Sequence, residues 1–281
     1  MDTLPTRDQF IEEISSARAG HSLPPRAEQL AEEFTTGILA LLFPHFASGD
    51  RAELDDVRGE ISSLEQQFMR LMVGQGMSRE RALEICHQFM GELPKLQRAL
   101  QEDAEATYQA DPAAVSVDEV LLAYPGFVAI TYYRIAHRLH RLGVELLPRL
   151  ITELAHRQTG IDIHPGATIG HSLAIDHGTG IVIGETSVIG DRVRLYQGVT
   201  IGALSVRKEF ASQKRHPTIG DDVVVYANAS LLGGDTVIGP GSVIGGNVWL
   251  THAVPAGSVV THGATVERQR LPEEPLLEYQ I

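Results

Sequence analysis

Two segments of the chain carry residue types that can perform acid–base chemistry. His177 follows Asp176 at the start of a glycine-rich stretch. Histidine is the usual general base near neutral pH, because it changes charge between about pH 5 and 8. Asp162 lies fifteen residues earlier, and an aspartate that accepts a hydrogen bond from the far ring nitrogen would fix the histidine tautomer. We therefore predict that His177 is a general base oriented by Asp162; a corner histidine without a role is the alternative.

The second segment is basic, although the protein as a whole is acidic. Arg207, Lys208, Lys214 and Arg215 all fall within it, and it closes on Arg215-His216-Pro217. A planar guanidinium suits a bidentate grip on a carboxylate. The segment therefore predicts a bound anion, a carboxylate or a cofactor phosphate, against the alternative of a solvated loop end.

Both segments interrupt a repeat that fills the second half of the chain. Aliphatic residues recur mostly at steps of six, and glycine often follows them, as in Ile169-Gly170, Ile189-Gly190 and Ile238-Gly239. A six-residue repeat is typical of a parallel β-helix, in which three hexads make one triangular coil. The step from Ile175 to Ile183 is eight residues, and the basic segment does not fit the hexad. Function on a rigid scaffold usually lies where such loops leave it.

The first half of the chain shows helical spacing instead. One predicted helix carries a stripe at steps of three and four: Leu54, Val57, Ile61, Leu64, Phe68 and Leu71. Ser116 and Glu119 form a capping-box pattern before a short helix, which Tyr124-Pro125-Gly126 ends. We therefore expect an α+β protein with an all-α helical domain over 1–159, a β-helix domain over 160–260, and an extended, flexible tail over 261–281.

Composition excludes several classes of function. The 281 residues carry a formal net charge of −13, which argues against nucleic acid or an anionic membrane as a partner. Cys86 is the single cysteine, so a disulfide framework is excluded and a reducing compartment fits. No signal peptide or membrane-spanning run is evident, and we expect a cytoplasmic protein. The six histidines from His164 to His262 lack the close spacing of a metal site, so no metal is predicted.

Beyond these patterns, the chain resembles a known family over about residues 105–260. The matching segments are Asp111-Pro112-Ala113, Tyr124-Pro125-Gly126-Phe127, Tyr133-Arg134-Ile135-Ala136-His137, Ile161-Asp162-Ile163-His164-Pro165-Gly166, Ile175-Asp176-His177-Gly178-Thr179-Gly180, Gly184-Glu185-Thr186 and Arg215-His216-Pro217. With them the sequence resembles the bacterial serine O-acetyltransferases, members of the hexapeptide-repeat acyltransferases. The resemblance implies a helical domain followed by a left-handed parallel β-helix.

The resemblance also implies a reaction and its residues. Enzymes of this family move an acetyl group from acetyl-CoA to the hydroxyl of L-serine, the first step of cysteine biosynthesis. By resemblance, His177 is the base and Asp162 orients it. The implied substrate-binding residues are Asp111, Asp176, Arg215, His216 and Glu185. The implied acetyl-CoA-binding residues are Gly202, Ala203 and Ala227. Family members often have Gly-Gly-Thr-Gly where this chain has Gly202-Ala203-Leu204-Ser205.

Partners follow from the same resemblance. Similar enzymes form trimers, or hexamers in which helical domains join two trimers, with acetyl-CoA between neighbouring copies. L-cysteine, a near-isostere of serine, is expected as a feedback inhibitor. The chain ends on Ile281, and related enzymes use a terminal isoleucine to dock into O-acetylserine sulfhydrylase. We expect the same partner here, against the alternative of an ordinary frayed tail.

Three other functions compete with this hypothesis. A hexapeptide acetyltransferase could act on a sugar or another hydroxyl acceptor, although a neutral sugar needs neither Asp111 nor Arg215. A metal-dependent β-helix hydratase would need stoichiometric metal. A non-catalytic scaffold would have no use for Asp162 and His177.

Overall fold

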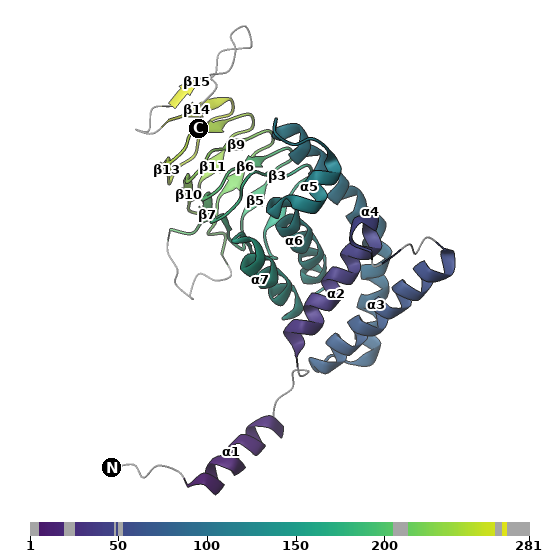
Figure 1. The fold of residues 1–281 in the computed structure, drawn as a ribbon. Helices are drawn as coiled ribbons and strands as arrows, with labels where there is room; N and C mark the ends of the chain where they lie inside the picture. Colours follow the sequence, from purple (N-terminus) through teal and green to yellow (C-terminus); the bar gives the residue numbers. More distant parts are fainter. Residues whose placement is uncertain are drawn as a thin grey trace.

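A computed structural model describes residues 6–19, 26–47, 49, 53–204, 213–261 and 266–268. Helices occupy the first part of the chain, and short strands follow (Figure 1). The helices are α1 (Arg7–Ala19), α2 (Ala27–Leu42), a 3-10 turn η1 (Pro44–Phe46), α3 (Leu54–Gly74), α4 (Arg79–Ala110), α5 (Val117–Ala123), α6 (Pro125–Arg141) and α7 (Leu147–Thr159).

Local sequence signals set the ends of these helices. Ser116 caps α5 by accepting from the Glu119 backbone N–H at 3.1 Å, as the capping-box pattern predicts. The Glu119 carboxylate accepts from the Val115 N–H at 2.6 Å, one residue earlier than a standard box would place it. Gly160 ends α7 in the left-handed conformation, with φ of 73°, which favours glycine.

The bundle core is built on the second half of the predicted stripe of α3. Leu64, Phe68 and Leu71 are buried, whereas Leu54 at the start of α3 is 66% exposed. Phe68 packs against Phe34 of α2 and Phe89 of α4, with ring centroids 5.7 and 6.2 Å away. Aromatic rings therefore tie three helices together.

The strands form a parallel β-helix, as the six-residue repeat predicts. They stack into three sheets of order β1-β4-β7-β10-β13, β11-β8-β5-β2 and β15-β14-β12-β9-β6-β3. The first sheet, called here the five-stranded face, comprises β1 (Asp162–Ile163), β4 (Val182–Ile183), β7 (Thr200–Gly202), β10 (Ser230–Leu232) and β13 (Trp249–Leu250). The second comprises β2 (Thr168–Ile169), β5 (Val188–Ile189), β8 (Thr218–Ile219) and β11 (Val237–Ile238). The third comprises β3 (Ala174–Ile175), β6 (Arg194–Leu195), β9 (Val224–Val225), β12 (Val243–Ile244), β14 (Ser258–Val260) and an antiparallel β15 (Val266–Arg268), which lies within the region expected as a tail.

The pairing register between successive coils explains the six-residue spacing of the aliphatic residues. On the five-stranded face Ile163, Ile183 and Ile201 pair in succession, and each is buried. The residue before each aliphatic position points outward, because side chains alternate along a strand. The aliphatic positions therefore build one continuous column of core, and the corners between strands carry the polar residues.

The first coil has no coil beneath it, and helical side chains cover its open end. Tyr133 of α6 donates to the Ala167 carbonyl at 2.6 Å, and His137 lies 2.8 Å from the Pro165 carbonyl. Arg134 donates to the Gly170 carbonyl at 2.8 Å. Side chains of α6 therefore satisfy backbone groups that would otherwise be an unpaired edge.

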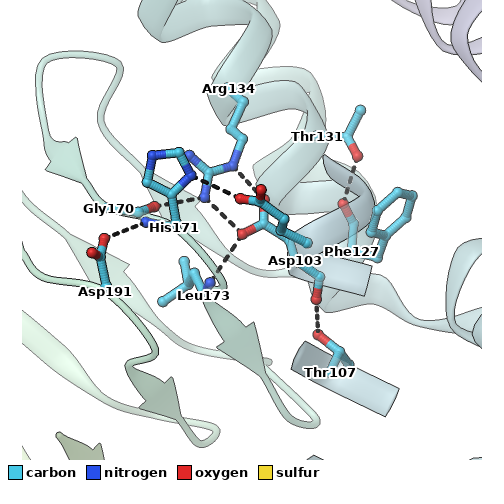
Figure 2. A network of polar contacts seen from close by, with 10 residues as sticks. Asp103, Thr107, Phe127, Thr131, Arg134, Gly170, His171, Leu173 and Asp191 are labelled. Atoms are coloured by element: carbon cyan, nitrogen blue, oxygen red, sulfur yellow. Dashed lines mark hydrogen bonds and ion pairs between the residues drawn. The ribbon is translucent and has the colours of Figure 1, made fainter. Parts of the chain in front are cut away.

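A buried ion pair fixes this junction (Figure 2). Arg134 donates through two nitrogens to Asp103 of α4, and the Leu173 backbone N–H donates to the same carboxylate at 2.9 Å. The Asp103 side chain is fully buried and that of Arg134 is 10% exposed. One carboxylate thus links α4, α6 and the residue before β3.

Among the described residues, no helix is both long and apolar enough to cross a membrane. The longest helix, α4, has 32 residues, but charged side chains recur along it.

We expect Arg134→Met to lower the free energy of unfolding by about 3–5 kcal/mol, because it leaves the Asp103 charge buried without a partner. Denaturant unfolding at fixed protein concentration measures the change. The double variant Asp103→Leu/Arg134→Met should lose less than Arg134→Met alone, since no buried charge remains.

Arg192→Met is the matched control for this prediction. It breaks a bidentate pair with Asp222 in which both side chains are 55% exposed, and it should change stability little. Equal losses from Arg134→Met and Arg192→Met would contradict the role assigned to the buried pair.

Candidate active site

His177 lies on one of the three long edges of the β-helix, between the third sheet and the five-stranded face. This edge, called here the histidine edge, comprises residues 176–181, 196–199, 226–229 and 245–248. The turn after β3 is two residues longer than the hexad requires. Within it, His177 adopts the left-handed backbone conformation, with φ of 56°. Its side chain is 61% exposed, and Nδ1 lies 3.9 Å from the Asp176 carboxylate. An exposed imidazole beside a carboxylate is suited to take a proton from a bound molecule.

The helical domain brings a second carboxylate to the histidine edge. Asp111 caps the C-terminus of α4, and its carboxylate accepts from the Ala113 N–H at 2.8 Å and from the Tyr124 hydroxyl at 2.6 Å. The hydrogen bond from Tyr124 is the largest cause that holds the Asp111 pKa below its usual range, and His177 adds to it. Asp111 thus stays ionised, which suits a cationic ligand group.

Close packing of Gly126 against the β-helix helps to hold the Asp111 carboxylate near it. A Cβ added at Gly126, in the first turn of α6, would lie 2.4 Å from the Ile175 carbonyl oxygen. Ile175 ends β3 and immediately precedes Asp176 and His177. The glycine therefore lets the start of α6 touch the strand that leads into the predicted base.

Arg215 and His216 lie on a different edge, between the five-stranded face and the second sheet. This arginine edge comprises residues 164–167, 184–187, 213–217 and 233–236. Arg215 donates to the Glu185 carboxylate, and the backbone N–H groups of Arg215 and His216 donate to Thr186 Oγ1 at 2.9 and 3.1 Å. Thr186 therefore fixes the end of the basic segment, of which residues 205–212 lie outside the described part of the chain.

Hydrogen bonds also set the tautomer of His216. Its Nδ1 accepts from the Thr186 backbone N–H at 3.0 Å, so the proton of the neutral ring resides on Nε2. The ring packs over Gly184, where an added Cβ would lie 2.1 Å from Nε2. Burial, with the charges of Arg215 and Lys214, lowers the His216 pKa to about 4. His216 is thus a neutral hydrogen-bond donor at physiological pH.

His164 joins the arginine edge from the coil below. Burial, and then the Arg149 charge, lower its pKa to about 4. Burial raises the Glu185 pKa, but the hydrogen bond from Arg215 and the neighbouring positive groups outweigh it, so the Glu185 pKa lies below its usual range. The edge therefore brings the Arg215 guanidinium and the Glu185 carboxylate together with two neutral imidazoles.

Within one chain, Asp162 is not hydrogen-bonded to His177 in the described part of the structure. Asp162 begins β1 and projects from the five-stranded face, where it pairs in register with Val182. Its carboxylate lies with Glu153 and His156 of α7, whose potential metal-ligand atoms are all within 4.8 Å of one another. Arg149 already pairs with Glu153, which reduces the negative charge available to a metal at this group. The group contains neither His177 nor His216.

The residues predicted to bind acetyl-CoA also divide between the two edges. Gly202 ends β7 and Ala203 follows it on the side of the arginine edge. Ala227 lies on the histidine edge, where its carbonyl accepts from the Asn247 N–H at 2.9 Å. Apart from Asp162, which lies on the five-stranded face itself, the candidate residues thus form two groups that this face separates.

Sequence reasoning missed three residues of these groups: Tyr124, His164 and Thr186. The turn pattern at Tyr124-Pro125-Gly126 indicates only the end of a helix, and the spacing of the histidines indicates no role for His164. Each of the three lies inside a segment that carries the family resemblance, and this location is the sequence signal that points to a role in the site.

Known proteins match this chain both in sequence and in fold. The family model described as serine acetyltransferase, N-terminal, matches residues 61–131. A serine acetyltransferase of Helicobacter pylori is 45% identical over 173 residues, which are 61% of this chain and 98% of that protein. The chain belongs to the serine acetyltransferase family. A plasmid-encoded serine acetyltransferase of Synechococcus elongatus is 56% identical over 187 residues, 65% of this chain and 58% of the relative's length.

Solved serine acetyltransferases share the fold. Serine acetyltransferase 1 of Entamoeba histolytica, in complex with L-cysteine, superposes with a TM-score of 0.76 at 34% identity, over 81% of this chain and 86% of that one. Two other solved serine acetyltransferases, 29% and 26% identical, are complexes with serine and with CoA.

Because His164 and His216 are neutral in the folded protein, we expect the stability of this serine acetyltransferase family member to change with pH. The folded-state pKa of His164 and His216 is about 4, below the value of about 6.5 for an unfolded chain. The unfolded chain therefore binds more protons between these values, and stability should fall as the pH drops from about 6.5 to 4. Denaturant unfolding across this range measures the slope. The variant His164→Asn/His216→Asn should show a shallower slope; an unchanged slope would contradict the assignment.

Proposed function

We propose that this chain transfers the acetyl group of acetyl-CoA to the hydroxyl of L-serine, giving O-acetyl-L-serine and CoA. The observation that carries this proposal is the division of charge between the two edges. The histidine edge offers the carboxylates of Asp111 and Asp176 beside an exposed imidazole, and the arginine edge offers a guanidinium and a neutral imidazole donor. A zwitterion with a hydroxyl group needs these three features together.

The proposed mechanism assigns a role to each group. The imidazole of His177 takes the hydroxyl proton as the oxygen attacks the acetyl carbonyl, and it then gives that proton to the departing thiol sulfur. Asp111 and Asp176 hold the ammonium group. Arg215, which has five N–H donors, holds the carboxylate while keeping Glu185, and His216 Nε2–H is a further donor.

We further propose that the site forms between two copies of the chain. The histidine edge of one copy would meet Asp162 and the arginine edge of the next, so that Asp162 orients His177 across the interface. Support comes from the five-stranded face that separates the two edges, because it exposes Val182 and Trp249, the latter 67% exposed. Exposed large apolar side chains favour association. A trimer, or a dimer of trimers joined by the helical domains, would bury them.

Two further proposals rest on family resemblance, and a third rests on composition. L-cysteine differs from serine by one atom in the side chain, so we propose that it competes with serine as a feedback inhibitor. We propose binding to O-acetylserine sulfhydrylase through Ile281, which lies outside the described residues. A cytoplasmic location is likewise proposed, on composition alone.

His177→Ala should lower turnover by about 10²–10⁴-fold, because the serine hydroxyl is a poor nucleophile without a base. Asp162→Asn should lower it less. The assay measures thiol release from acetyl-CoA with L-serine, with a sugar acceptor run in parallel. His252→Ala, at another corner of the β-helix, is the matched control. If the protein releases no thiol with L-serine, or if His177→Ala keeps normal turnover, the proposed function is wrong.

Mixed oligomers test the shared site. Copies carrying His177→Ala, co-assembled with copies carrying Arg215→Ala, should recover about a quarter of the wild-type activity, since random pairing restores that share of interfaces. His177→Ala mixed with Asp111→Ala should recover nothing, because both residues belong to one edge and every copy lacks one of them. Recovery in neither mixture would contradict a site formed between copies.

A further inference from the structure

We propose that Tyr124 is a positioning residue that fixes the orientation of the Asp111 carboxylate and so sets selectivity for the ammonium group of the acceptor. The proposal deepens the proposed function and rests on it. Tyr124 acts through Asp111 and is assigned no step in the chemistry.

Hydrogen bonds hold both oxygens of the Asp111 carboxylate. Oδ1 accepts from the Ala113 backbone N–H at 2.8 Å, and Oδ2 accepts from the Tyr124 hydroxyl at 2.6 Å. Two donors on different oxygens define the plane of the carboxylate, and each oxygen retains a lone pair for an incoming N–H donor. Loss of the tyrosine hydroxyl would leave one anchor and let the group rotate.

Tyr124 is itself held firmly between two helices. It ends α5, where its backbone N–H donates to the Val120 carbonyl at 3.2 Å, and it also caps the start of α6. Pro125 provides the first turn of α6, and Gly126 packs against the Ile175 carbonyl. The contact of Gly126 with the strand that leads into Asp176 and His177 therefore fixes the backbone next to Tyr124, and the phenol hydroxyl links this point to a carboxylate of the helical domain.

The charges around the phenol keep it a donor. The hydrogen bond to Asp111, followed by burial, raises the Tyr124 pKa to about 12, and Glu119 and Asp176 contribute. The hydroxyl thus retains its proton at physiological pH. Asp111 in turn stays ionised through the same hydrogen bond.

The test compares two acceptors in Tyr124→Phe, which keeps the ring and removes the hydroxyl. L-serine carries the ammonium group, and 3-hydroxypropanoate is the same molecule without it. We expect kcat/KM for L-serine to fall about ten- to a hundredfold, the usual worth of a hydrogen bond to a charged group. The KM for acetyl-CoA should stay within twofold, and 3-hydroxypropanoate, measured as substrate or competitive inhibitor, should be affected little.

Tyr108→Phe is the matched control, because it removes the same hydroxyl from a half-buried tyrosine of α4. It should leave all three measurements unchanged. A general loss of structure in Tyr124→Phe would lower use of both acceptors alike, and such a parallel loss would overturn the proposal.

A double-mutant cycle isolates the coupling. Tyr124→Phe should have little effect in an Asp111→Ala background, since the tyrosine acts only through that carboxylate. Additive effects would overturn the proposal. The wild-type protein separates failure of this proposal from failure of the proposed function. If the wild-type protein releases no thiol with L-serine, the proposed function is wrong. If the wild-type protein is active and Tyr124→Phe keeps the same preference for serine, only the role of Tyr124 is wrong.

Discussion

The open end of the first coil is the constraint on which the rest of the structure depends. A parallel β-helix pairs each coil with its neighbours, so its first coil presents carbonyl and N–H groups that have no partner below. Here Tyr133 and Arg134 of α6 and Asp103 of α4 satisfy such groups. Because the Asp103–Arg134 pair is buried, its full set of hydrogen bonds is needed to offset the cost of desolvation. That requirement sets how α4 and α6 sit against β3.

The placement of the candidate site residues follows from this junction. The helix α4, held at Asp103, is capped eight residues later by Asp111, and α6 begins where Gly126 touches Ile175. The segment between these two helices, which contains α5, is therefore held beside the strand that leads into Asp176 and His177. A charged pair at the base of the β-helix thus determines which carboxylate of the helical domain faces the imidazole.

The sequence singled out chemical groups without fixing how they meet. The residue types of Asp162 and His177 predicted a base and an orienting carboxylate, and the structure places both in the first coil, in β1 and in the turn after β3. In one chain, however, the outward face of β1 directs Asp162 toward α7, so spacing alone did not bring the pair together. Tyr124 shows the converse: its turn-forming role was evident, but its hydrogen bond to Asp111 depends on how two helices meet.

The sequence by itself determined the β-helix and the helical first half, and it predicted which segments carry acid–base and anion-binding residues. These are local or periodic properties: a hexad repeats wherever an aliphatic side chain must enter the core, and a capping serine acts within one helical turn. Only the tertiary structure decided that Asp111 joins His177 on one edge while Arg215 and His216 occupy another. Those placements depend on contacts between residues far apart in the chain, such as Asp103 with Arg134 and Gly126 with Ile175, which no local pattern specifies.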